Sequence, residues 1–154
     1  MSIEAGQPVP DFRLPRDGGG ETGPADFAGR TLVLYFYPKD DTPGCTTEAL
    51  EFSARIEDFD AAGAVVFGIS KDSVRSHDRF RDKHGLRVIL LSDETGAVLE
   101  RFGVWKEKSM YGRTFMGIER STFLVGPDGT VARVWRNVKV PGHVGEVLEA
   151  ARNL

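Results

Sequence analysis

The sequence has 154 residues but only one cysteine and three histidines, and it contains no long run of apolar residues. A single cysteine cannot form a disulfide within the chain, and it excludes a CxxC motif or a cysteine-based zinc site. No apolar run approaches the ~20 residues that span a bilayer, and the first residues lack the charged and apolar regions of a signal peptide. We therefore expect no membrane association and a reducing, cytoplasmic location.

The chain also lacks an excess of charge of either sign. It has 20 Lys and Arg against 23 Asp and Glu, so the formal net charge is −3. Nucleic-acid-binding proteins usually carry a basic patch, and no nucleic-acid partner is predicted. The basic segment RSHDRFRDKHGLR (75–87) is interrupted by acidic residues and is interpreted as a solvated helix face. His77 and His84 lie there without a third ligand at an obvious spacing, so we expect solvated histidines and no metal or cofactor.

What the sequence does contain is a regular alternation of apolar runs and amphipathic segments. Strands are predicted over 31–37, 64–70 and 87–92, and a β-hairpin over 120–136 turns at 127–129. Helices are predicted over 43–62, 72–85, 93–104 and 142–154. The glycine-rich segment 16–23 lacks the ending of a phosphate-binding loop and is interpreted as a hairpin or connecting loop.

This order of elements predicts a single α/β domain over residues 1–154, with a central mixed β-sheet flanked by helices on both faces. The closing hairpin and helix are typical of a thioredoxin-like fold. Between the third helix and the hairpin, the segment VWKEKSMYGRTFMG (104–117) is interpreted as a loop. Its aromatic residues and methionines either pack against the body or line an active-site mouth or a subunit interface.

The only cysteine, Cys45, follows Thr42, Pro43 and Gly44 at the expected start of a helix. Thr is a good N-cap and Pro is favoured at the first helical position. The end of a helix carries partial positive charge and free N–H groups, which favour the thiolate form of a cysteine. Cys45 also lies on the apolar face of this helix, where an inert buried thiol is the alternative. The Thr-Pro-Gly lead-in favours the reactive interpretation.

Two separated segments give the chain a family resemblance. Pro38, Thr42 and Cys45 match the Pro-x-x-x-Thr-x-x-Cys motif of peroxiredoxins, and GIERSTFLVGPDG (117–129) is similar to the stretch that supplies their active-site arginine, here Arg120. The subgroup that the chain resembles most is the bacterioferritin comigratory protein type, or Q type. The resemblance implies a thiol-dependent peroxidase whose Cys45 thiolate reduces hydrogen peroxide and organic hydroperoxides and becomes a sulfenic acid.

The resemblance also implies a role for each site residue. The Thr42 hydroxyl would hydrogen-bond the thiolate and the substrate oxygen. Arg120, a permanent cation with several donors, would stabilise the thiolate and the charge that moves onto the peroxide. Pro38 would shield the sulfur from bulk water.

One departure from the subgroup concerns regeneration. Many Q-type members carry a resolving cysteine five residues after the first, where this chain has Leu50. We therefore expect a one-cysteine variant that depends on an external thiol, which is thioredoxin, glutaredoxin or a low-molecular-weight thiol. A monomer or weak homodimer is expected. Two alternatives remain open, a peroxide-sensing redox protein and a hydrolase that pairs Cys45 with His77 or His143.

Overall fold

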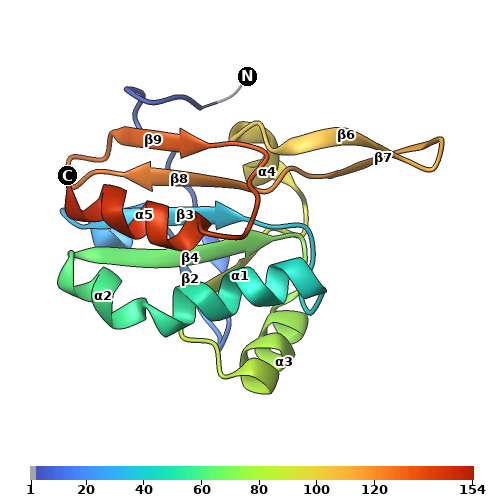
Figure 1. Cartoon of the computed structure of the whole chain (residues 1–154), viewed down its shortest axis with the longest axis horizontal. Helices are drawn as coiled ribbons and strands as arrows, with labels where there is room; N and C mark the ends of the chain where they lie inside the picture. Colours follow the sequence, from blue (N-terminus) through green and yellow to red (C-terminus); the bar gives the residue numbers. More distant parts are fainter. Residues whose placement is uncertain (1–2) are drawn as a thin grey trace.

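A five-stranded mixed sheet forms the centre of the computed structural model, which describes residues 3–154 (Figure 1). The strand order is β5-β4-β3-β8-β9, in which β3 and β5 run parallel to β4, and β8 runs antiparallel to β3 and β9. These strands are β3 (Thr31–Phe36), β4 (Ala64–Ser70), β5 (Ile89–Ser92), β8 (Ser121–Val125) and β9 (Val131–Trp135). Every residue of β3 is buried, because the central strand is covered on both faces.

The two faces of the sheet carry separate core clusters. Along β3, Val33 and Tyr35 belong to one cluster, whereas Leu34 and Phe36 belong to the other, as the alternation of strand side chains requires. The first cluster is covered by α1 (Pro43–Ala54), α2 (Ile56–Ala61) and α5 (His143–Arg152). The second is covered by α4 (Ala97–Arg101) and the N-terminal segment. The predicted α/β class with helices on both faces is therefore confirmed.

Helix α3 (Val74–His84) lies beside the β5 edge of the sheet and contributes Phe80 to the first cluster (Figure 1). The Ser73 hydroxyl accepts a hydrogen bond from the Ser76 N–H at its N-terminus, and Gly85 ends it with a left-handed conformation. No helix in residues 3–154 combines the length and the apolar character needed to cross a bilayer.

The glycine-rich segment forms a hairpin, one of the two interpretations of this segment. Strands β1 (Leu14–Pro15) and β2 (Glu21–Thr22) pair antiparallel, and a 3-10 helix, η1 (Pro24–Phe27), follows. In the turn between the two strands, Gly18, Gly19 and Gly20 all have positive φ angles, a conformation that residues with a Cβ rarely adopt.

Two predicted helices differ from the structure. The helix expected over 43–62 is broken at Arg55, whose backbone (φ −106°, ψ 13°) ends α1 and begins α2. The helix expected over 72–85, which starts with an Asp-Ser cap signal, is confirmed as α3, with Ser73 as its N-cap and Gly85 as its C-cap. The helix expected over 93–104 shrinks to α4, since Gly96 takes a left-handed conformation ahead of it.

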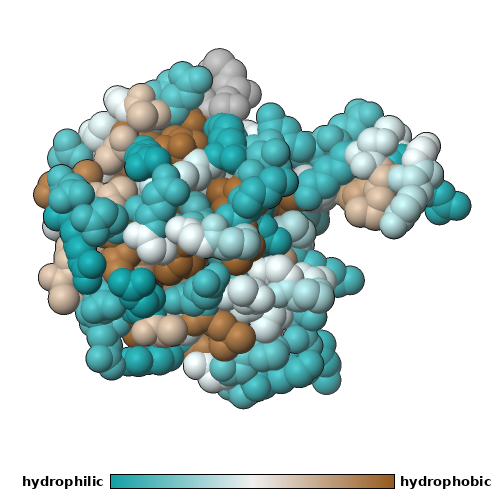
Figure 2. All heavy atoms as spheres, in the orientation of Figure 1, coloured by the Kyte–Doolittle hydropathy of each residue, from teal (hydrophilic) through white to brown (hydrophobic). Residues whose placement is uncertain are grey.

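The segment interpreted as a loop is a projecting β-hairpin. Strands β6 (Trp105–Met110) and β7 (Arg113–Ile118) pair antiparallel and extend away from the body (Figures 1 and 2). Tyr111 and Gly112 both have positive φ angles at the turn, as a two-residue hairpin turn requires. Four of its large apolar side chains are exposed, namely Met110, Tyr111, Phe115 and Met116. Trp105 and Ile118, at the other end of the hairpin, pack with the second core cluster.

Candidate active site

Cys45 lies in the first turn of α1, with its side chain in the core cluster below the helix. The helix begins at Pro43 and Thr42 occupies the N-cap position, as expected. The cysteine is only 2% exposed. The backbone N–H groups of a first helical turn have no partners within the helix, so the sulfur sits where an anion is favoured.

Arg120 connects this sulfur to a second buried group. Its Nη2 donates to Cys45 Sγ at 3.5 Å, and its Nη1 donates to Glu48 Oε1 at 2.6 Å. The arginine immediately precedes β8, an interior strand of the sheet. Gly44 gives it room, because a Cβ at that position would lie 3.2 Å from Nη2. The planar guanidinium thus serves two acceptors at once.

Glu48 is a buried carboxylate that the sequence analysis did not single out. Its side chain is fully buried, and its second oxygen, Oε2, has no hydrogen-bond partner among residues 3–154. Burial raises the pKa of Glu48 to about 7, although the charge of Arg120 and its hydrogen bond act in the opposite direction. The carboxyl group beside Cys45 therefore changes its charge near neutral pH.

The segment that leads into α1 holds the other two predicted site residues. Pro38 lies two residues after the end of β3 and is half-buried. The Thr42 hydroxyl donates to the Lys39 carbonyl at 2.8 Å and makes no capping bond to the helix. Its oxygen retains lone pairs for a further donor. Asp41 between them has a positive φ of 59°, so the segment turns sharply before the helix.

The projecting hairpin supplies a second cation near the sulfur. Lys108 of β6 is half-buried, and its pKa is lowered first by burial and then by the positive charge of Arg120, while Cys45 acts in the opposite direction. Gly117 on the paired strand allows the Lys108 stem to lie flat, because a Cβ there would be 3.1 Å from Lys108 Cδ. The base of the hairpin is thus part of the electrostatic surroundings of Cys45.

His77 and His143 are hydrogen-bonded to groups other than Cys45. The prediction that His77 is solvated is wrong, because its ring is buried. His77 is fully buried, with its two ring nitrogens against Asp40 and the Leu91 carbonyl. His143 Nε2 lies 2.8 Å from the Thr122 hydroxyl, and burial lowers its pKa to about 4. These contacts leave neither ring oriented as a base for Cys45, which weakens the hydrolase alternative.

A shallow hollow opens beside the first turn of α1. Its volume is about 440 Å³, and mostly apolar groups line it from the helix and from the segment before α5: Pro43, Gly44, Thr47, Glu51, Val140 and Pro141. A small apolar substituent of a substrate fits such a surface.

Comparisons with known proteins agree with this geometry. Residues 5–134 match the AhpC/TSA family. The chain belongs to this family. It is 46% identical over 154 residues to "Peroxiredoxin Bcp" of Bacillus subtilis, covering 100% of this chain and 98% of the relative. It is 52% identical over 142 residues to "Peroxiredoxin Bcp" of Xanthomonas campestris, covering 92% and 89% respectively. The predicted membership in the bacterioferritin comigratory protein type of peroxiredoxin is confirmed.

Solved structures place this family member in the same fold group. A structure of the Xanthomonas campestris bacterioferritin comigratory protein, from work on its alkyl peroxide reduction activity, superposes with a TM-score of 0.91 at 49% identity, covering 97% of this chain and 98% of that chain. Two other structures of the Xanthomonas peroxiredoxin carry serine in place of two different cysteines. The present chain has one cysteine, so it lacks the second thiol of that relative.

Glu48, which the sequence analysis missed, and His77, which it placed in solvent, share a recognisable signal. Glu48 is one helical turn after Cys45, on the same face as Ala49 and Phe52, which are both buried. His77 is likewise three residues before the buried Phe80. A charged or polar residue at a position that the periodicity assigns to the core is the observation that would have found them.

Proposed function

We propose that the chain is a one-cysteine thiol peroxidase that reduces hydrogen peroxide and organic hydroperoxides at Cys45. The observation that carries this proposal is the Arg120 bridge between the Cys45 sulfur and the buried Glu48. A permanent cation within reach of a thiolate at a helix N-terminus supports both the nucleophile and the charge that it displaces.

The reaction begins with attack of the Cys45 thiolate on the terminal oxygen of the hydroperoxide. A sulfur–oxygen bond forms and the O–O bond breaks, so the sulfur is oxidised by two electrons and the remaining oxygen leaves as alkoxide or hydroxide. That oxygen takes up a proton and departs as alcohol or water, and Cys45 is left as a sulfenic acid. The proposed role of Arg120 is to stabilise the departing negative charge. The Thr42 hydroxyl is proposed to turn from the Lys39 carbonyl to hydrogen-bond the sulfur and the substrate, and Pro38 is proposed to exclude water.

An external thiol is proposed to complete the cycle, because the chain has no second cysteine. One thiol condenses with the sulfenic acid, releasing water and forming a mixed disulfide, and a second thiol then displaces Cys45. Thioredoxin, glutaredoxin or a low-molecular-weight thiol has the required chemistry. Since the cycle consumes thiols, we propose a reducing compartment, the cytoplasm. A monomer or weak homodimer is proposed.

The test is the fate of Cys45 after one equivalent of peroxide. The intact mass of the protein should increase by one oxygen atom, and dimedone should trap the resulting sulfenic acid. The Cys45→Ser variant should consume no peroxide while keeping its fold. Continuous peroxide consumption with thioredoxin or a small thiol separates an enzyme from a peroxide sensor. A dominant Cys45–Cys45 disulfide dimer on a non-reducing gel would contradict the external thiol, and peroxide consumption by Cys45→Ser would contradict the proposed function itself.

A further inference from the structure

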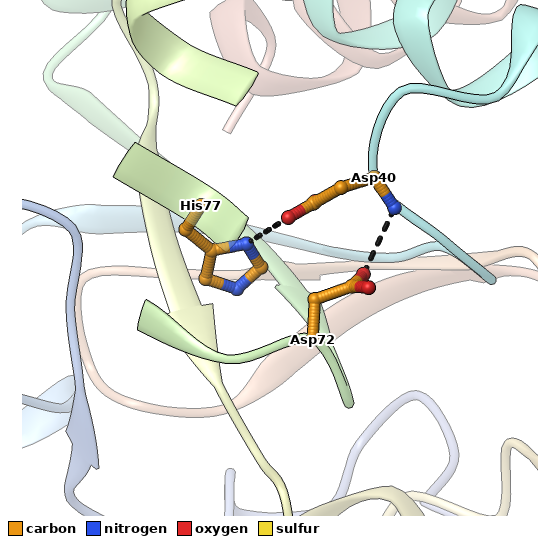
Figure 3. Close-up of side chains that lie close together, drawn as sticks. All are labelled: Asp40, Asp72 and His77. Carbon is orange, nitrogen blue, oxygen red and sulfur yellow. Dashed lines mark hydrogen bonds and ion pairs between the residues drawn. The ribbon is translucent and has the colours of Figure 1, made fainter. Parts of the chain in front are cut away.

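The segment between β3 and α1 is bonded to the body of the protein through one buried carboxylate, Asp40. The Tyr37 hydroxyl donates to Asp40 Oδ1 at 2.6 Å, and the Ser76 hydroxyl donates to Oδ2 at 2.8 Å. His77 Nδ1 lies 2.7 Å from the same Oδ2 (Figure 3). The Asp40 backbone N–H donates to the Asp72 carboxylate at 2.9 Å. Both oxygens of a buried charge are therefore satisfied.

The partners of His77 determine which of its nitrogens carry protons. Nε2 lies 2.9 Å from the Leu91 carbonyl, which only accepts, so Nε2 must carry a hydrogen. Nδ1 faces the Asp40 carboxylate, whose other neighbours are hydroxyl donors. Because the two Asp40 oxygens already accept from these hydroxyls, the proton between Nδ1 and Oδ2 is assigned to His77, which then donates from both nitrogens as an imidazolium.

The surroundings of His77 support this charge state. The ring is 0% exposed, and burial by itself lowers the pKa of His77. The hydrogen bond and charge of Asp40, the Leu91 carbonyl and the charge of Asp72 outweigh burial, so the pKa is raised above its usual value. The remaining titratable neighbour is Tyr37, whose ring lies 6.5 Å away and whose pKa is raised well above its usual range by burial and Asp40.

The cluster of Asp40, Asp72 and His77 brings together three ligand-type atoms within 4.8 Å, but it is not an open metal site. Asp40 Oδ1 and Oδ2 accept from Tyr37, Ser76 and His77. The Asp72 carboxylate accepts from Ser70 and from the Asp40 backbone. A cation would have to displace these donors, so the cluster is better described as a connection between chain segments.

We propose that His77 is a positioning residue for the peroxidase site, because as a doubly donating cation it ties Asp40 to the Leu91 carbonyl of β5 and so fixes the segment from Pro38 to Thr42. Asp40 lies two residues from each of these proposed site residues. The role rests on the proposed function, because its readout is the reaction of Cys45 with peroxide.

Two substitutions each keep one of the two hydrogen bonds of His77 and remove the other. His77→Asn places an amide near Nδ1 and keeps the donor to Asp40, whereas His77→Gln places it near Nε2 and keeps only the donor to Leu91. Each variant loses one buried hydrogen bond and the imidazolium charge, and the larger loss of thermal stability is expected in His77→Gln, because its lost bond is to a carboxylate. The rate constant for Cys45 oxidation by hydrogen peroxide at pH 7 should fall at least tenfold in His77→Gln and less than threefold in His77→Asn.

A third variant controls for general destabilisation. Leu99→Ala opens the core cluster on the opposite face of the sheet, away from Cys45, and should lower stability while leaving the oxidation rate within twofold. Equal oxidation rates in His77→Gln, His77→Asn and the wild type would overturn the proposal. Equal slowing in both histidine variants would also overturn it, since the hydrogen bond to Asp40 would then matter no more for the oxidation rate than the hydrogen bond to Leu91.

A spectroscopic measurement is independent of peroxidase activity. Nitrogen-15 NMR of the reduced wild-type protein should show both His77 ring nitrogens protonated at pH 7. A neutral His77 with a single N–H at that pH would exclude the imidazolium bridge, whatever the activity. Conversely, an unreactive wild-type Cys45 together with a doubly protonated His77 would place the failure in the proposed function and not in the bridge.

Discussion

Replacing Arg120 with lysine tests the part of the site on which the proposed chemistry depends most. Lysine keeps the positive charge but has one ammonium group, whereas the guanidinium contacts two acceptors, Cys45 Sγ at 3.5 Å and Glu48 Oε1 at 2.6 Å. The ammonium group should follow the shorter contact, to the buried carboxylate, and leave the sulfur. A hydrogen bond to a charged group contributes about 1.5–3 kcal/mol, which corresponds to a rate lower by about 10-fold to 150-fold.

The assay is the loss of free Cys45 thiol under excess hydrogen peroxide, quenched with an alkylating reagent and quantified by mass spectrometry. Arg133→Lys is the matched control, because Arg133 pairs with Glu146 on the surface and both side chains are about half exposed. The control should react at the wild-type rate. An Arg120→Lys rate within threefold of the wild type would refute the bridging role. A large fall in stability with an unchanged rate would assign Arg120 to structure alone.

Three further outcomes are expected. Glu48→Gln removes a carboxyl group whose pKa in the folded protein, about 7, is above its ordinary value. The stability that this group gives the wild type is present below pH ~4.5 and is lost as the pH rises through ~7. In urea unfolding, the stability of the variant relative to the wild type should therefore rise by up to ~3 kcal/mol between pH 4 and pH 8. Thr42→Val should slow Cys45 oxidation at least tenfold while Thr42→Ser does not, with little change in melting temperature, because the hydroxyl bonds Lys39 and not the helix. Ser73→Ala should cost about 1 kcal/mol in denaturant unfolding, since it removes the N-cap bond of α3.

The sheet and most helices could be predicted because their signals are local. The apolar run of β3 and the N-cap of α1 each occupy a few consecutive residues. A boundary was missed where the backbone interrupts a helical pattern, as at Arg55, whose φ of −106° and ψ of 13° end α1 and begin α2. The β6–β7 hairpin was missed because its charged residues and Tyr111 at the turn give neither a clean alternation nor a common turn sequence.

The residues of the site likewise divide into those with a local sequence signal and those without one. Cys45 and Thr42 could be found from one segment, and Arg120 only from the family resemblance, because nothing in the sequence alone indicates that residues 75 positions apart meet. Glu48 and His77 could not be found from a motif, because each is a buried polar residue whose partner comes from a distant part of the chain. Burying such groups costs free energy unless they are paired, so a fold that keeps Glu48 near Cys45 and His77 against the segment before α1 is organised for more than stability. Glu48 orients the cation that faces the sulfur, and Asp40 with His77 fixes the segment above the same helix turn. The reactivity proposed for a single thiol therefore depends on buried charges that the apolar pattern of the sequence would have assigned to the core.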